Sequence, residues 1–145
     1  MIGLLQRARQ GRVLIDGESV AEIGTGLVVL VGVEKGDDRS RADRLLQRLL
    51  SYRVFADEQG RMNLSLVDIA GGLLLVPQFT LVADTRKGMR PGFSSAAEPQ
   101  LGEALFSYLS EQAARHHDQV ACGVFGADMQ VELVNDGPVT FWLTS

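Results

Sequence analysis

The sequence contains only one cysteine, Cys122, so no disulfide can form within the chain. It also lacks any run of about 18 apolar residues, which a membrane-spanning helix would need. The N-terminal stretch MIGLLQRARQGR is apolar over too short a length for a secretory signal, and its charges lie on the wrong side. We therefore expect a cytoplasmic protein with no membrane anchor. Because Cys122 lies in the apolar segment VACGVFG, a small buried side chain is the favoured interpretation over a nucleophile.

The sequence also has no excess of positive charge. The chain has 14 Lys and Arg against 18 Asp and Glu, and its net charge is −4 at pH 7. This balance argues against a protein that grips long nucleic acid through a broad basic surface, although it allows a local contact with a short nucleic-acid end. The motifs HExxH, paired CxxC, GxxxxGK(S/T) and GxSxG are also absent. We expect neither a metal ion nor a cofactor.

The remaining pattern predicts one domain over residues 1–145, since no repeat, low-complexity tract or linker interrupts it. Strand-like runs cover residues 12–15, 19–23 and 27–33, and the turn signals Asp16-Gly17 and Gly24-Thr25-Gly26 join them. This arrangement predicts an antiparallel opening. Further strands are expected near Val54, over residues 72–76, and in a closing antiparallel pair over residues 129–134 and 139–143.

Two helices are predicted between these strands. Asp37 or Asp38 can cap the first, which runs to about Tyr52 with leucines at helical spacing. Ser94 or Ser95 can cap the second, which ends near residues 116–117. The predicted fold class is α/β, with a single domain dominated by antiparallel, barrel-like sheet pairing and two main helices.

His116 and His117 are the only histidines in the sequence. Neighbouring residues on a helix point about 100° apart, so these two cannot easily bind one metal ion together. Their position in the last helical turn suits an interaction with the helix dipole instead.

Three segments concentrate the residues with chemical potential. Residues 76–81 (VPQFTL) end a buried strand, where main-chain N–H groups become free to meet a ligand; alternatively the strand simply continues with Phe79 and Leu81 inward. Residues 84–93 carry three cations among glycine and proline, which suits a phosphate or the end of a nucleic acid, or else an ordinary solvated loop. Residues 135–138 (NDGP) form the third segment.

Asp136-Gly137 would normally predict a tight hairpin, but Pro138 follows where a returning strand needs its N–H group. A cis peptide bond between Gly137 and Pro138 would give the turn a fixed main-chain geometry able to recognise a ligand. The alternative is a trans proline in an edge loop, since only about 5–6% of such bonds are cis in folded proteins.

Taken together, these segments resemble the D-aminoacyl-tRNA deacylase family over nearly the whole chain. The resemblance is carried by GVEKGD (residues 32–37), MNLSL (62–66), QFTL (78–81), ADTRKGMRPGF (83–93), FGADM (125–129) and NDGPVT (135–140). It implies a homodimeric cytoplasmic hydrolase that cleaves the ester between a D-amino acid, or glycine, and the 3′-terminal adenosine of tRNA.

The resemblance also implies roles for individual residues. Gly137 and Pro138 would form a cis motif that one subunit inserts into the active site of the other, where it excludes the side chain of an L-amino acid. The catalytic residues would be Gln78, Phe79 and Thr80, with main-chain N–H groups around Phe79 and Thr80 stabilising the oxyanion and Thr80 in a positional role. The tRNA-binding residues would be Arg86, Lys87 and Arg90. Arg7 would brace the Gly-Pro turn or be a surface charge on a first strand.

Two positions depart from the family pattern. Pro77 stands in place of the usual serine, and this change removes a hydroxyl and a main-chain donor. In this respect the chain resembles a branch of deacylases with relaxed chiral selection. Met89 stands where a polar residue is more familiar. Three other functions stay open: a relaxed-chirality deacylase, a small-ester hydrolase that pairs Thr80 with a histidine, and a non-catalytic module that binds the tRNA end.

Overall fold

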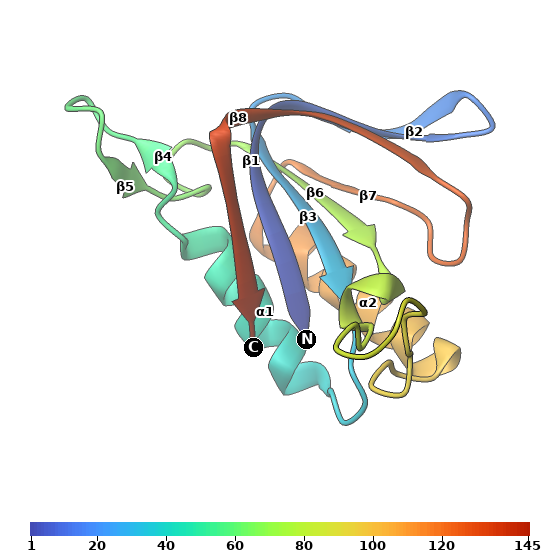
Figure 1. The fold of residues 1–145 in the computed structure, drawn as a ribbon. Helices are drawn as coiled ribbons and strands as arrows, with labels where there is room; N and C mark the ends of the chain where they lie inside the picture. Colours follow the sequence, from blue (N-terminus) through green and yellow to red (C-terminus); the bar gives the residue numbers. More distant parts are fainter.

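A six-stranded mixed sheet forms the centre of the computed structural model, which describes residues 1–145 (Figure 1). Along the sheet the order is β2-β1-β3-β6-β7, and β8 pairs with the other edge of β1. β1 is antiparallel to β2, β3 and β8, whereas the β3–β6 and β6–β7 pairs are parallel. The sheet strands are β1 (Ile2–Ile15), β2 (Glu18–Ile23), β3 (Gly26–Gly32), β6 (Gly72–Pro77), β7 (Val120–Cys122) and β8 (Gln130–Thr144).

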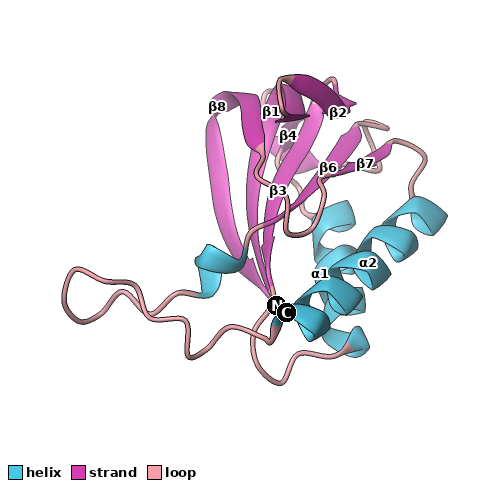
Figure 2. Ribbon diagram, turned by 90° about the vertical axis from the view of Figure 1, so that its right-hand side faces the viewer, coloured by secondary structure: helices cyan, strands magenta, loops and turns pink.

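Both helices, α1 (Arg39–Ser51) and α2 (Pro99–His116), lie on the same side of this sheet and contact each other (Figure 2). A core cluster of 20 buried residues fills the space between the helices and the sheet. A small separate hairpin of β4 (Phe55–Ala56) and β5 (Met62–Leu64) follows α1. The predicted α/β class with two main helices and barrel-like, largely antiparallel pairing is confirmed. Neither helix is long and apolar enough to cross a membrane.

The predicted start of α1 is confirmed in detail. The Asp38 carboxylate accepts a hydrogen bond from the main-chain N–H of Arg41 at 3.0 Å, which satisfies one of the unpaired donors of the first turn. On the inner face, a stripe of aliphatic side chains is buried against the core: Ala42, Leu45, Leu46 and Leu49.

The predicted start of α2 was wrong. The helix begins at Pro99, with Glu98 at the capping position, and neither Ser94 nor Ser95 caps it. The Ser95 hydroxyl donates instead to the carbonyl of Val82, and the Ser95 carbonyl accepts from the N–H of Lys35 at 2.9 Å. These long-range contacts hold Ser95 in a turn before the helix, which the Ala96 N–H closes by donating to the Phe93 carbonyl at 3.1 Å. The proline at the first helical position then suits a helix start, because its missing N–H would have no partner there.

The first strand is much longer than predicted. β1 begins at Ile2 rather than at residue 12, and its first half pairs with β3 while its second half pairs with β2. Polar residues at 6, 7, 9 and 10 break the apolar alternation, so the sequence gives no local strand signal there. Pairing with neighbours on both edges supplies the stabilisation that the local pattern lacks.

The predicted closing hairpin was also wrong. Residues 130–144 form one strand, and both halves of β8 pair with β1: residues 130–134 lie against 10–14, and residues 140–144 against 2–6. Between them, Asp136–Val139 bulge opposite Arg7, and Figure 1 shows β8 sharply bent along its course. A bulge needs no ladder hydrogen bond from Pro138, which is why the proline is tolerated inside a strand.

Candidate active site

The chain leaves the sheet at the end of β6. The N–H of Gln78 donates to the carbonyl of Val31 at 2.8 Å, and the chain then enters the 3-10 helix η1 (Phe79–Val82). The first helical bond runs from the Leu81 N–H to the Gln78 carbonyl at 3.3 Å. The N–H groups of Phe79 and Thr80 therefore have no acceptor within the helix. Two main-chain donors thus lie side by side at this strand end.

The side chains around these donors lie largely in the open. Phe79 is 61% exposed, so the alternative of a continuing strand with Phe79 inward is wrong. The amide Nε2 of Gln78 donates to Oγ1 of Thr80, which fixes the orientation of the threonine hydroxyl. No histidine or carboxylate takes part in this pair.

A cleft of about 450 Å³ opens next to Phe79. One wall is the end of β6 with Pro77 and Gln78, and the start of α2 closes the bottom. Phe125–Met129 form the other wall. Gly123 allows this second wall to pack closely against β6. A Cβ at this position would lie only 2.9 Å from the Met129 sulfur and 3.3 Å from the Pro77 ring.

The sequence does not predict the second wall as part of the site. FGADM is only one of the family-like motifs, and Gly123 lies in the apolar run around Cys122. The close approach of Gly123 to β6 is a tertiary fact with no local signature. Burial raises the pKa of the Cys122 thiol, so this cysteine stays protonated and unreactive at neutral pH.

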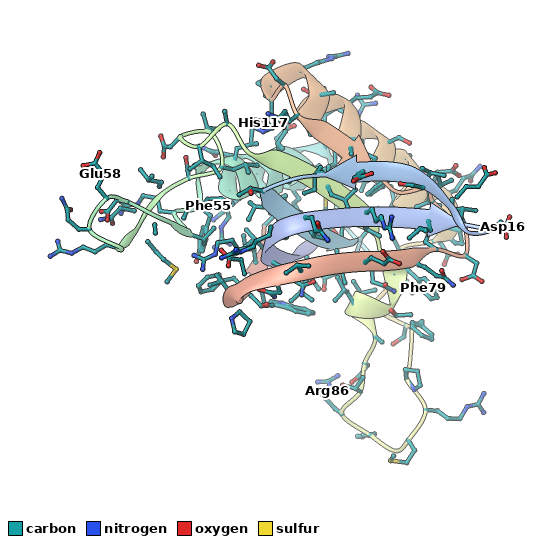
Figure 3. All side chains as sticks on the ribbon, turned by 90° about the horizontal axis from the view of Figure 1, so that it is seen from above. Asp16, Phe55, Glu58, Phe79, Arg86 and His117 are labelled. Carbon is teal, nitrogen blue, oxygen red and sulfur yellow. The ribbon has the colours of Figure 1, made fainter.

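The cationic segment forms a loop that projects away from the sheet, as Figure 3 shows for Arg86. Its base is closed by two hydrogen bonds between Asp84 and Gly92, at 2.7 and 2.9 Å. The Arg86 guanidinium donates to both carboxylate oxygens of Asp84 and holds the pKa of Asp84 well below its usual range. Lys87 and Arg90 have no carboxylate partner. Of the three predicted tRNA-binding cations, Arg86 is thus partly neutralised and the other two are free.

The Gly137-Pro138 segment lies in the bulge of β8, and its peptide bond is cis. Both residues are exposed. On one side, the Asn135 side-chain oxygen accepts from the Val139 N–H at 2.8 Å. On the other side, Arg7 donates from Nε to the Asp136 carbonyl at 2.9 Å. The segment is therefore held from both ends while its middle faces outward.

Arg7 is not a surface charge. Its side chain is only 15% exposed, and its Nη1 also donates to the Val54 carbonyl at 2.7 Å. The guanidinium thus connects the bulge of β8 to the start of the β4–β5 hairpin, which the one-dimensional pattern could not reveal.

The two candidate regions lie far apart within one chain. Arg7, which faces the bulge, pairs with Leu27 near the start of β3, whereas Pro77 pairs with Val31 near its end. Four residues of strand correspond to about 13 Å, and three strand spacings, about 14 Å, separate β8 from β6. Gly137-Pro138 of one chain therefore cannot reach the Gln78–Thr80 region of the same chain.

The two histidines also lie away from this region. Of the α2 residues that line the cleft, Phe106 is the nearest to His116, which follows 10 residues later, about 15 Å along the helix. Nδ1 of His116 is 2.8 Å from the carbonyl of Gln112, and Nε2 of His117 is 2.6 Å from that of Gly71. Neither can act as a base for Thr80. No group of three or more His, Cys, Asp or Glu side chains is arranged to hold a metal ion.

Comparison with known proteins gives a consistent result. Residues 4–144 match the family model described as D-Tyr-tRNA(Tyr) deacylase. A D-aminoacyl-tRNA deacylase from Stutzerimonas stutzeri is 66% identical over 145 residues, with both chains fully covered. Among solved structures, a c-Myc DNA unwinding element binding protein has 34% identity and a TM-score of 0.95, covering 100% of this chain and 99% of that one. A probable eukaryotic D-amino acid tRNA deacylase shares the fold at 20% identity and a TM-score of 0.81, covering 98% of this chain and 97% of that one.

Proposed function

This chain belongs to the D-Tyr-tRNA(Tyr) deacylase family, whose members hydrolyse aminoacyl-tRNA esters. From this premise we propose how it cleaves the ester and how it distinguishes D-aminoacyl from L-aminoacyl substrates. The chain is a D-aminoacyl-tRNA deacylase, a carboxylic ester hydrolase. We propose that it cleaves D-aminoacyl and glycyl esters of the 3′-terminal adenosine and rejects L-aminoacyl esters. The observation that carries this proposal is the pair of free N–H groups of Phe79 and Thr80 beside an apolar cleft, with no side-chain base nearby.

These two N–H groups suit the developing oxyanion of ester hydrolysis. Fixed main-chain donors cost no reorganisation during the reaction. The ester is already activated by the neighbouring 2′-hydroxyl of the ribose, which can position the attacking water. The absence of a histidine base is then no obstacle. Thr80 has no base to activate it, so we assign its hydroxyl, held by Gln78, to positioning rather than to nucleophilic attack.

The cleft beside Phe79 is the proposed site of the terminal adenosine. Its volume of about 450 Å³ lies in the range of small-molecule sites, and the Phe125 ring on its second wall offers a flat apolar surface to a base. An adenosine seated there would direct its ribose ester towards the main-chain donors of η1.

Chiral selection is proposed to come from a second copy of the chain. A site that accepts many D-amino acids cannot read their side chains, so it has to test where the substituents on the α-carbon point. The exposed Gly137-Pro138 segment is a rigid main-chain wall suited to this test, but it lies too far from Gln78–Thr80 of its own chain. We therefore propose a homodimer in which each copy places this segment in the other copy's active site.

The outer edge of β8 supports such pairing. Its 15 residues have no strand beyond them, and it exposes Trp142 at 53% and Val134 at 46%. A long open edge with large apolar side chains is a ready surface for association. We expect Trp142→Glu to yield monomers in analytical ultracentrifugation and to lose the preference for D over L esters. Val20→Glu, at an equally exposed strand position, is the matched control. A wild-type monomer that still rejects L esters would refute the dimer proposal.

The main test compares hydrolysis of D-Tyr-tRNA, L-Tyr-tRNA and Gly-tRNA by the wild type and by Thr80→Ala, with a chelator present. We expect the wild type to clear the D and glycyl esters and spare the L ester, with substantial activity left in Thr80→Ala. Equal cleavage of L and D esters would place the chain with the relaxed-chirality deacylases and point to Pro77. Tight tRNA binding without any cleavage would instead support a binding module.

A further inference from the structure

The strongest unexplained feature of the surface is a pair of exposed aromatic rings. Phe79 and Phe93 pack against each other with centroids 5.2 Å apart at an angle of 45°, yet they remain 61% and 40% exposed. Adjacent apolar rings that stay exposed to solvent commonly mark a binding surface. The proposed oxyanion chemistry uses only the main chain of Phe79 and leaves both rings without a role.

The position of Phe93 is well fixed. It directly follows the two hydrogen bonds between Asp84 and Gly92 that close the base of the cationic loop. Its own carbonyl accepts from the N–H of Ala96 at 3.1 Å. The ring is thus presented by a braced segment, which lowers the entropic cost of binding a partner to it.

The pair lies between two regions that the substrate is expected to contact. Phe79 lines the cleft proposed for the terminal adenosine, and Figure 3 shows it at the root of the loop that carries Arg86. Further out on that loop, Lys87 and Arg90 have no carboxylate partner. A single strand leaving the cleft towards these cations would pass over the two rings.

We propose that Phe79 and Phe93 form a stacking platform for the nucleobase that precedes the terminal adenosine, the penultimate cytosine of tRNA. This inference rests on the proposed function, because it takes the cleft as the adenosine site. Single-stranded RNA ends are commonly held by bases stacked on aromatic side chains, with cations along the backbone. The platform adds recognition of the polynucleotide to a site that otherwise reads only an aminoacyl-adenosine.

The test uses three D-tyrosyl esters: of adenosine, of the dinucleotide CpA, and of the same dinucleotide with an abasic residue in place of cytidine. We expect the wild type to have a KM for the CpA ester lower than for the other two by roughly 5- to 150-fold, the range that stacking on an aromatic ring supplies. Phe93→Ala is expected to remove this advantage and to leave the adenosine ester unaffected.

Two further variants distinguish base stacking on Phe93 from a merely structural role of its side chain. Phe93→Tyr keeps an aromatic face and should preserve the preference for CpA, whereas Phe93→Leu keeps apolar bulk and should lose it. Met89→Ala, at the fully exposed tip of the same loop, should change nothing. Equal weakening of all three esters by Phe93→Ala, or its dissociation into monomers in ultracentrifugation, would overturn the platform in favour of a structural or subunit contact.

Failure of the platform can be told apart from failure of the proposed function. Calorimetry with uncharged CpA and its abasic analogue compares their binding affinities without turnover. A chain that hydrolyses no ester but prefers CpA through Phe93 refutes the hydrolytic proposal alone. A chain that hydrolyses D-Tyr-tRNA but treats CpA and abasic dinucleotides alike refutes the platform alone.

Discussion

The guanidinium of Arg7 joins the main chain of Asp136 to that of Val54. Its Nε donates to the Asp136 carbonyl at 2.9 Å, and its Nη1 donates to the Val54 carbonyl at 2.7 Å. Because Asp136 immediately precedes Gly137, the exposed Gly-Pro segment is anchored through one side chain to a hairpin on a different part of the fold. Arg7 is therefore a positioning residue for the proposed chiral wall.

Arg7→Ala is expected to lower discrimination between D-Tyr-tRNA and L-Tyr-tRNA by roughly 10- to 100-fold, because small displacements of a positioning element have effects of this size. The measurement is the ratio of kcat/KM for the two esters. Arg9→Ala is the matched control: Arg9 lies on the same strand and also bonds to Asp136, but to its carboxylate, and its side chain is 74% exposed. Equal effects of the two variants would contradict a specific role of Arg7.

Gly137→Ala is expected to disturb both stability and selectivity. Gly137 has a φ of +133°, and an added Cβ would come within 2.8 Å of the Val139 side chain and 2.9 Å of Nη2 of Arg7. This positive φ disfavours any L side chain by about 1–3 kcal/mol, and Arg7 has to move. Thermal unfolding and the ratio of D to L cleavage measure the two effects. Gly24→Ala, where nothing lies within 4 Å, should be close to neutral in both assays.

Loss of either histidine is expected to leave deacylation of D-Tyr-tRNA essentially unchanged. His116 lies about 15 Å along α2 from Phe106, the nearest residue of that helix that lines the cleft. The rates of His116→Ala and His117→Ala, measured against the wild type at neutral pH, check this expectation. A loss of about 100-fold or more in kcat, with the folded state intact by circular dichroism, would revive the esterase that pairs Thr80 with a histidine.

Asp37→Asn is expected to lower the free energy of unfolding by about 3 kcal/mol. The Asp37 side chain is 3% exposed and accepts from the Met1 ammonium at 2.7 Å. It also accepts from the N–H of Glu34 at 2.7 Å. Removing the charge leaves a buried ammonium without its main partner. Urea unfolding measures the change, and Glu34→Gln is the control because that carboxylate is 40% exposed and 3.8 Å from the same ammonium. A shift as small as that of the control would show that the buried pair contributes little.

Local patterns in the sequence were sufficient for some elements of this fold. The leucine spacing and the acidic cap of α1 are satisfied within the helix and one face of the core, so the prediction from residue 38 onwards was correct. The buried strand of residues 72–76 is likewise bounded by its own glycine and proline signals. Several family-like motifs in order identified the class of enzyme, because chemistry is tied to short segments whose residues are neighbours in the chain.

Only the tertiary structure decided the start of α2, the length of β1 and the course of β8. For α2 and β8 a local signal, the serines at 94–95 or Asp136-Gly137, was overruled by hydrogen bonds between residues far apart in the sequence, and for β1 such bonds formed a strand where the local signal was missing. The same holds for the site: the second wall of the cleft depends on Gly123 packing against β6, and the bracing of Gly137 depends on Arg7 reaching across two elements. Sequence determines which groups are available, whereas long-range pairing determines which of them meet, because register and packing are properties of the whole sheet.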